Sequence, residues 1–153
     1  MTRGVLAFLL AALVLTGCAG DTAPRETVAF ERVPMAGGGA LPFSAAVRVG
    51  PLLYLSGQLG TDSTLRLVPG GIGPETRQAL ENVRSIVAGA GASMDRIVKC
   101  TVMLADMREW GAMNEEYVKF FPAALPARSA LGANGLALGA RVEIECIAAL
   151  EDE

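Results

Sequence analysis

The chain contains no histidine among its 153 residues, so it lacks the side chain that most often moves protons near neutral pH. Serine–histidine–aspartate and cysteine–histidine catalytic machinery is therefore excluded, as are zinc sites of the HExxH type. Any reaction must use carboxylates, arginine, hydroxyl groups, backbone amides and water.

Cysteine is scarce, and its three positions form no CxxC pair and no metal-ligand spacing. Cys100 and Cys146 each lie inside an apolar, strand-like run, VKCTVMLA and VEIECIAAL. We interpret them first as buried thiols, because a free cysteine packs as a small hydrophobic side chain. A disulfide between them is the alternative, and it requires two Cα atoms that lie close together.

The sequence also lacks an excess of basic residues: 13 lysines and arginines oppose 16 aspartates and glutamates, for a net charge of −3. Proteins that bind nucleic acids normally carry a basic surface, so this balance argues against that class. A small anionic ligand would need one local cation rather than an overall positive field. The length is that of one domain of ordinary size.

The longest apolar run lies in MTRGVLAFLLAALVLTGCAGD at the N-terminus, where Arg3 precedes residues 5–15. This run is too short for a transmembrane helix and indicates a signal peptide over residues 1–17. The ending LTGC resembles the bacterial lipobox, so we expect Cys18 to carry a lipid. We therefore expect a periplasmic protein anchored to a membrane, with the outer membrane favoured because residue 19 is not aspartate. A secreted protein and an uncleaved anchor are the alternatives.

The rest of the chain divides into a tether over residues 18–40 and a domain over residues 41–153. The tether contains a candidate edge strand in TVAFERV. In the domain, VRVG and LLYLSGQLG flank Gly50-Pro51 and predict a β-hairpin.

Helical spacing predicts one helix within residues 70–93 and a second within 107–121, each followed by an extended run. The order β, β, α, β, α, β, β predicts an α+β domain, a mixed sheet with both helices packed on one face. Aromatic and apolar residues recur in the second helix at near-helical intervals, and we interpret them as core: Trp110, Met113, Tyr117 and Phe121.

Five segments occur in an ordered combination: PFSAAVRVGPLLYLSGQLG, QALENVRSIVAGAGASMDRIVKCTVMLADM, NEEYVKFF, LPARSAL and VEIECIA. In order and spacing they resemble the RidA/YjgF family of reactive intermediate deaminases, also called the L-PSP endoribonuclease family. The resemblance implies a chorismate-mutase-like fold, a homotrimer with clefts between subunits, and no metal or organic cofactor. It also implies hydrolysis of enamines and imines of 2-amino acids, of the 2-aminoacrylate type, to 2-oxo acids and ammonia.

LPARSAL then has a chemical interpretation, because an imine of an amino acid carries a carboxylate. The planar guanidinium of Arg128 offers two parallel donors to such a group. Glu143 and Glu145 alternate with apolar residues and so face one side of their strand. The resemblance matches Glu143 to the family's acidic site residue, which would orient water and pass a proton to the departing amine. We interpret Glu145 as a solvated or interface residue. A structural ion pair between Arg128 and either glutamate is the alternative.

The resemblance also matches Ser56 and Asn114 to family residues that contact substrate or water, and Gly57 allows a close backbone approach. Without the family resemblance, we would interpret the Ser-Gly pair as a turn and Asn114 as a solvent-facing residue or a local cap. Two positions depart from the family pattern. Phe43 replaces a tyrosine and keeps an aromatic wall, whereas Ala130 replaces a cysteine and keeps only a backbone donor. Both are expected to contact the substrate, a small carboxylate.

The sequence is compatible with three functions. The first is a hydrolase similar to 2-iminobutanoate/2-iminopropanoate deaminase. The second is a non-catalytic trimeric module that binds small carboxylates in the same cleft. The third is a ribonuclease, which the acidic charge balance and the missing histidine make the weakest of the three.

Overall fold

The computed structural model describes residues 29–34 and 41–151. The predicted signal peptide, Cys18 and most of the tether lie outside these residues. Within them, no helix combines the length and the apolar character that crossing a bilayer requires.

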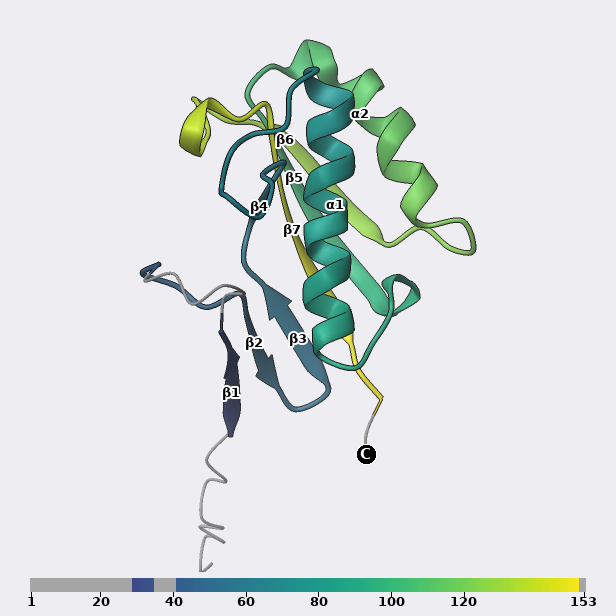
Figure 1. Cartoon of the computed structure of the whole chain (residues 1–153). Coiled ribbons are helices and arrows are strands. Elements are labelled where there is room, and N and C mark those ends of the chain that lie inside the picture. The colour runs from purple at the N-terminus through teal and green to yellow at the C-terminus, as the bar shows by residue number, and fades with distance from the viewer. Residues whose placement is uncertain (1–28, 35–40, 152–153) are drawn as a thin grey trace, which may run out of the picture.

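Seven strands form one mixed sheet (Figure 1). Its order is β1 (Phe30–Val33), β2 (Ala46–Val49), β3 (Leu52–Leu55), β7 (Val142–Ala149), β5 (Ile97–Leu104) and β6 (Ala127–Gly132), and the short β4 (Gln58–Leu59) also pairs with β7. The β5–β6 pair is parallel and the other pairs are antiparallel. β1 and β6 therefore lie at the two edges.

The hairpin predicted around Gly50-Pro51 is present, since β2 and β3 pair in antiparallel register. Gly50 adopts a φ of 55°, in the left-handed region that glycine enters without steric cost. β1 pairs with β2 and occupies the place where TVAFERV is a candidate edge strand.

Two helices pack on one face of the sheet, α1 (Ile72–Gly89) and α2 (Trp110–Tyr117) (Figure 1). α1 buries a stripe at helical spacing that includes Ala79, Leu80, Val83 and Val87. α2 is shorter than the predicted helix because 3-10 turns flank it, η2 (Met107–Glu109) before it and η3 (Val118–Phe120) after it. Two further 3-10 turns are η1 (Met94–Arg96) and η4 (Ala137–Gly139). The predicted fold class, a mixed sheet with two helices on one face, is confirmed.

Alternation along β5 and β7 sorts their side chains between the two faces of the sheet. Val142, Ile144 and Cys146 are buried under the helices, whereas Glu143 and Glu145 point to the opposite face. No helix of the described residues covers that opposite face, which we call the open face.

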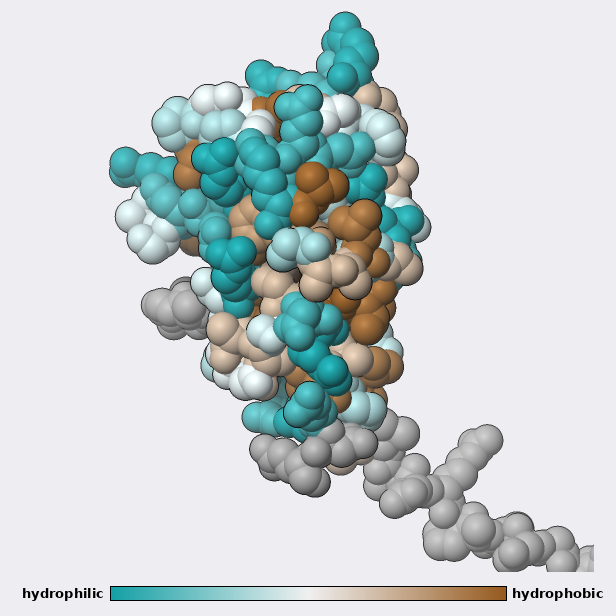
Figure 2. Space-filling view, turned by 90° about the vertical axis from the view of Figure 1, so that its right-hand side faces the viewer, coloured by the Kyte–Doolittle hydropathy of each residue, from teal (hydrophilic) through white to brown (hydrophobic). Residues whose placement is uncertain are grey.

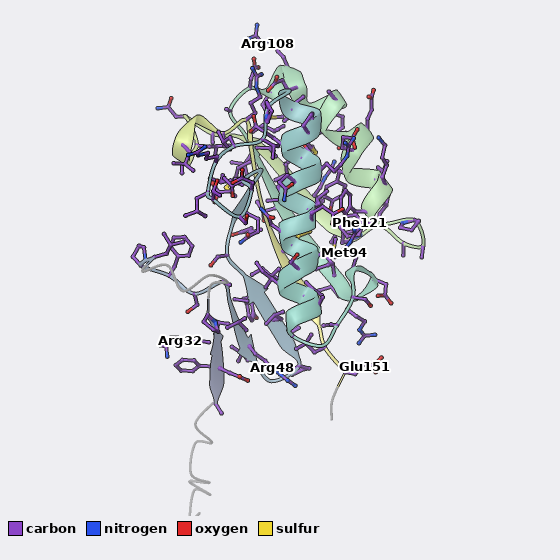
Figure 3. The ribbon with its side chains drawn as sticks, viewed as in Figure 1. Arg32, Arg48, Met94, Arg108, Phe121 and Glu151 are labelled. Carbon is purple, nitrogen blue, oxygen red and sulfur yellow. A yellow bond between two sulfur atoms is a disulfide. The ribbon has the colours of Figure 1, made fainter. Side chains whose placement is uncertain are left out.

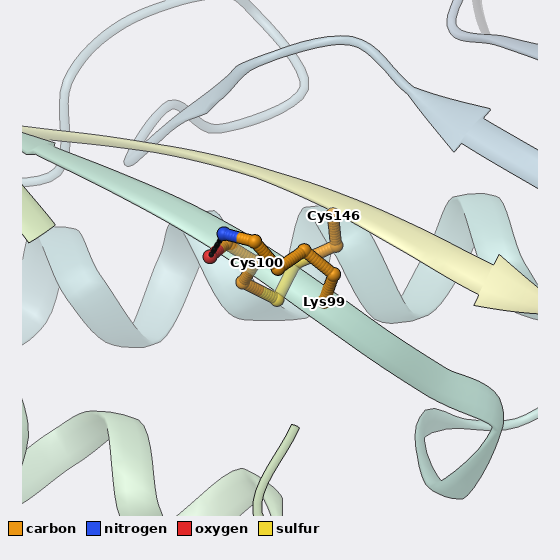
Figure 4. Close-up of a disulfide and its surroundings, with 3 residues drawn as sticks. All are labelled: Lys99, Cys100 and Cys146. Atoms are coloured by element: carbon orange, nitrogen blue, oxygen red, sulfur yellow. Dashed lines mark hydrogen bonds between the residues drawn. A yellow bond between two sulfur atoms is a disulfide. The ribbon is translucent and has the colours of Figure 1, made fainter. Parts of the chain in front are cut away.

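Cys100 and Cys146 form a disulfide (Figure 4), so the first interpretation of these residues as free thiols is wrong. The two residues stand directly opposite each other in the antiparallel register of β5 and β7. Their Cα atoms are only 4.1 Å apart and both side chains are buried. A directly opposed, side-by-side pair of this kind brings two sulfur atoms within bonding reach.

The helix side of the molecule carries an apolar hollow of about 570 Å³. Met94 and Phe121, labelled in Figure 3, are among its lining residues. Figure 2 shows apolar side chains gathered on this side among polar ones. None of the site residues predicted from the sequence lines this hollow.

Candidate functional site

Arg128 lies in β6 and points to the helix side of the sheet. It pairs in parallel register with Cys100, whose side chain is buried under the helices, and paired residues of neighbouring strands share a face. The guanidinium carbon lies 4.6 Å from the ring centroid of Tyr117 and 5.8 Å from that of Trp110. Both rings belong to α2, so this helix and the edge strand together hold the arginine.

No ion pair or side-chain hydrogen bond engages Arg128 among residues 29–34 and 41–151. The alternative interpretation, a structural ion pair with Glu143 or Glu145, is therefore not found in the chain. The contacts with the two rings are cation–π contacts, and they pair none of the N–H donors of Arg128 with an acceptor.

Asn114 lies between Trp110 and Tyr117 in the sequence of α2. The spacing of these three residues places them on one side of the helix. The Oδ1 of Asn114 and the hydroxyl of Tyr117 are buried and lack a hydrogen-bond partner within the described structure. Buried polar atoms are nearly always paired in native proteins. These two atoms therefore mark a place where a ligand, water or another subunit is expected.

Burial raises the pKa of Tyr117 to about 12, although the positive charge of Arg128 acts in the opposite direction. The phenol is consequently neutral at physiological pH.

Ala130, two residues beyond Arg128 on the same strand face, packs against the core. We call Trp110, Asn114, Tyr117, Arg128 and Ala130 the arginine half-site.

Four residues within 107–121 are interpreted as core from the sequence. That interpretation holds for Met113, Tyr117 and Phe121, which are buried, but is wrong for Trp110, which is 43% exposed. Trp110 is the first residue of α2 and contacts Arg128 of β6, the edge strand. No further strand of the described residues lies beyond β6 to bury the indole. Sequence reasoning thus missed Trp110 and Tyr117 as neighbours of the arginine. Their helical spacing with Asn114 is the signal that could have found them.

A second group of predicted residues surrounds the turn between β3 and β4. The hydroxyl of Ser56 donates a hydrogen bond to the carbonyl of Ser44 at 2.7 Å, and its backbone N–H donates to Ala45 at 2.9 Å. Ser56 thereby fixes the segment that carries Phe43, whose side chain is 51% exposed. Since its proton is engaged, the Ser56 oxygen remains available as an acceptor.

Gly57 is required by the position of Glu143. A Cβ atom on Gly57 would lie 2.9 Å from the carboxyl carbon of Glu143 and closer still to one of its oxygens. The close approach expected at this glycine is thus made by the Glu143 side chain. Only a residue without a side chain leaves room for the carboxylate there.

Burial raises the pKa of Glu143, and the negative charge of Glu145 on the same strand raises it further. A carboxyl group with a raised pKa exchanges a proton more readily near neutral pH, which suits general acid–base chemistry. Glu145 is solvent-exposed, as expected. We call Phe43, Ser56, Gly57 and Glu143 the glutamate half-site.

The two half-sites lie on opposite faces of one sheet. Glu143 pairs with Met103 of β5 and belongs to the open face, whereas Arg128 belongs to the helix side. The structure brings Arg128, Asn114 and Ala130 together, and it brings Ser56 and Gly57 to Glu143, but one chain does not join the two sets. In the same described residues, no cluster of three or more potential metal-binding side chains occurs.

Fold and geometry define a small α+β protein. An arginine without an acceptor among the described residues lies on one face of its sheet, and a partly buried carboxyl group with a raised pKa lies on the other. The chain belongs to the Endoribonuclease L-PSP family, whose model matches residues 36–150. This is the RidA/YjgF family that the sequence segments resemble, so the predicted membership is confirmed.

Curated relatives agree with this assignment. The mouse protein named 2-iminobutanoate/2-iminopropanoate deaminase is 45% identical over 125 residues, which cover 81% of this chain and 90% of the mouse protein. The human protein of the same name is 40% identical, with 81% and 89% covered.

Solved structures show the same fold. RidA from an Antarctic Psychrobacter is similar with a TM-score of 0.70 and 35% identity, covering 82% of this chain and all of that one. Escherichia coli TdcF with bound serine is similar with a TM-score of 0.70 and 31% identity, covering 83% and 100%.

Proposed function

We propose that the protein hydrolyses imines and enamines derived from amino acids to 2-oxo acids and ammonia. The observation that carries the proposal is Arg128, a guanidinium held by aromatic rings with its donors unpaired, in a chain similar to proteins named deaminases. A carboxylate is the group that best matches two parallel N–H donors.

The working unit in this proposal is a homotrimer. In a cyclic assembly the helix-side edge of one subunit can meet the open face of the next, and each contact repeats around the axis. Such a contact would place the arginine half-site of one subunit opposite the glutamate half-site of its neighbour. Three equivalent clefts would result, which accounts for the separation of the two half-sites within one chain.

In each cleft Arg128 binds the substrate carboxylate and fixes the plane of the imine. The Asn114 amide lies beside it and supplies a further polar contact. Across the cleft, Glu143 accepts a proton from water as the water oxygen bonds to the imine carbon. Glu143 then gives that proton to the nitrogen, which completes a carbinolamine. Glu143 next accepts the proton of the carbinolamine hydroxyl and passes it to the amine, so that the carbon–nitrogen bond breaks, ammonia leaves and the carbon–oxygen double bond forms. The Ser56 oxygen accepts a hydrogen bond from the same water.

The substrate proposed is a small amino-acid imine, consistent with the names of the curated relatives. The serine in the TdcF structure supports a ligand of this size and charge. Phe43 and Ala130 line the cleft with an aromatic ring and a methyl group. Neither supplies a hydroxyl or a thiol, so the reaction depends on Arg128, Glu143 and water.

The test is hydrolysis of 2-iminobutanoate, formed in situ by an amino-acid dehydratase, by the fragment that begins after residue 18. We expect Arg128→Ala to lower kcat/KM about 100-fold, because a charged, bidentate contact contributes roughly 3 kcal/mol. Arg84→Ala is the matched control. Arg84 also stacks on a ring, that of Phe120 at 4.7 Å, but it pairs with Glu81 and lies outside both half-sites.

Two results would contradict the proposal. Equal rates for the wild-type fragment and Arg128→Ala would remove the arginine from the reaction. A wild-type fragment that binds the product 2-oxobutanoate but does not accelerate hydrolysis would instead identify the non-catalytic binding module.

We also propose that the chain is a lipoprotein of the periplasmic side, on the basis of the apolar run and the LTGC ending. Labelling of cells with a fatty-acid analogue should mark the wild-type protein and not Cys18→Ser. An unlabelled wild-type protein would contradict this assignment.

A further inference from the structure

The support of Arg128 differs from that of the arginines that form ion pairs and resembles that of Arg32, whose guanidinium carbon lies 4.8 Å from the ring centroid of Phe30. Arg77, Arg84, Arg108 and Arg141 each pair with a carboxylate. Arg128 instead contacts two ring faces and has no carboxylate partner in the part of the chain that is described. The four carboxylate-paired arginines commit N–H donors to their own chain, whereas Arg128 commits none to a carboxylate of the described residues.

The geometry points to Tyr117 and Trp110 as positioning residues for the carboxylate-binding arginine, an inference that rests on the proposed function. We infer that their rings hold the guanidinium flat and direct its N–H edge away from the core. Each ring contact falls within the distance at which a cation is attracted to an aromatic face. Neither residue touches the reacting atoms in this account.

The Tyr117 ring, rather than its hydroxyl, performs this role. The side chain is buried, with 2% exposed, and the hydroxyl has no partner within the described residues. The ring also packs on Phe121, with centroids 4.9 Å apart, which fixes its plane. The phenol stays neutral because burial raises its pKa to about 12, so it does not compete for the guanidinium charge.

Trp110 supports the guanidinium from a second position. It is 43% exposed, so a ligand bound to Arg128 can reach its indole. It is also the only tryptophan of the sequence. Its fluorescence therefore reports on the arginine half-site without a label.

The decisive comparison is Tyr117→Phe against Tyr117→Leu in steady-state hydrolysis. Phenylalanine keeps the ring, so we expect its KM to stay within about 2-fold of the wild type. Leucine removes the ring, and a lost cation–π contact should raise KM about 10-fold. The value of kcat should change little, because substrate and transition state carry the same carboxylate and lose the same binding.

Trp110 supplies a second pair of variants that does not disturb the core. Trp110→Leu should raise KM several-fold, whereas Trp110→Phe should keep most of the wild-type value. Because this side chain is exposed, circular dichroism should show both variants folded as the wild type is. A merely structural role for the rings would lower stability and leave KM unchanged in the folded fraction.

Direct binding separates this inference from the proposed function. Titration with 2-hydroxybutanoate, a carboxylate that does not turn over, should change Trp110 fluorescence saturably in the wild type and in Tyr117→Phe. The change should be lost in Arg128→Ala and weakened about 10-fold in Tyr117→Leu.

Wild-type KM and affinity in both leucine variants would overturn the inference while leaving the hydrolysis intact. Equal damage by Tyr117→Phe and Tyr117→Leu would also overturn it, since that result assigns the role to the hydroxyl. Ring-dependent binding without any hydrolysis would leave the inference standing and would remove the proposed function.

Discussion

At the scale of single residues, the environment of each side chain decides its chemistry. Glu143 and Glu145 are separated by one residue and share a face, yet Glu143 is partly buried against Gly57 and Glu145 is exposed. The pKa of Glu143 is raised, first through burial and then through the charge of Glu145. The proposed function therefore uses Glu143 as the proton carrier and treats Glu145 as a solvated charge.

This difference predicts a pH effect. If Glu143 is the base, kcat/KM should rise with pH through its pKa and level off above it. Glu145→Gln removes a negative neighbour, which lowers the pKa of Glu143 and should move the acidic limb of the profile to lower pH. A profile of kcat/KM against pH for both proteins measures the shift.

Glu151→Gln is the control for that measurement, because Glu151 is an exposed carboxylate near the C-terminus, where it lies close to Arg96. Its acidic limb should coincide with that of the wild type. An acidic limb in Glu145→Gln that stays in place or moves to higher pH would remove Glu143 as the titrating base.

The resemblance to the family identified Arg128, Asn114, Ser56, Gly57 and Glu143 as site candidates, because a family pattern fixes positions along the chain. It did not reveal that Arg128 and Glu143 lie on opposite faces of the sheet. Side-chain direction depends on strand register, and the parallel pairing of β5 with β6 cannot be deduced from either strand by itself. The helical spacing of Trp110 and Tyr117 likewise could not predict that the first side chain is exposed and the second is buried.

At the scale of elements, the hairpin, both helices and the long strands follow from local patterns. β4 has two residues and was not distinguished from its loop, since so short a strand has no period of its own. The pairing of Cys100 with Cys146 depends on antiparallel register between β5 and β7, which are 46 residues apart at this point. No local pattern contains that register.

The disulfide should stabilise the domain. For a loop closed across 46 residues, the chain-entropy model gives about 4 kcal/mol, most of it from restriction of the unfolded chain. We therefore expect reduction to lower the urea midpoint of the fragment that begins after residue 18. Urea titration with and without dithiothreitol measures this, with the thiol state checked by mass spectrometry.

The double variant Cys100→Ala with Cys146→Ala is the control, and its midpoint should not respond to the reductant. A wild-type midpoint that stays unchanged after complete reduction would show that the cross-strand bond does not contribute to stability.

At the scale of the whole molecule, the two half-sites lie on opposite faces of one sheet. Within residues 29–34 and 41–151, the arginine half-site has N–H donors without acceptors and buried polar atoms without partners, while the glutamate half-site has a carboxyl group on a sheet face that no helix covers. A neighbouring subunit would complete both half-sites if its glutamate half-site faced the arginine half-site of the first subunit. In the proposed function, the trimer is therefore a requirement for activity.

Mixed assembly tests this claim most directly. Arg128→Ala and Glu143→Gln homotrimers should each be nearly inactive, because every cleft lacks one of the two groups. When the two proteins are unfolded and refolded together in equal amounts, half of the arginine half-sites and half of the glutamate half-sites are intact. Random cyclic assembly then makes about a quarter of the clefts complete.

We therefore expect the mixture to recover about one quarter of the wild-type rate of 2-iminobutanoate hydrolysis, whereas the separately refolded variants should stay nearly inactive. A mixture that stays as inactive as its components, although its subunits have exchanged, would show that Arg128 and Glu143 do not act together across a subunit boundary.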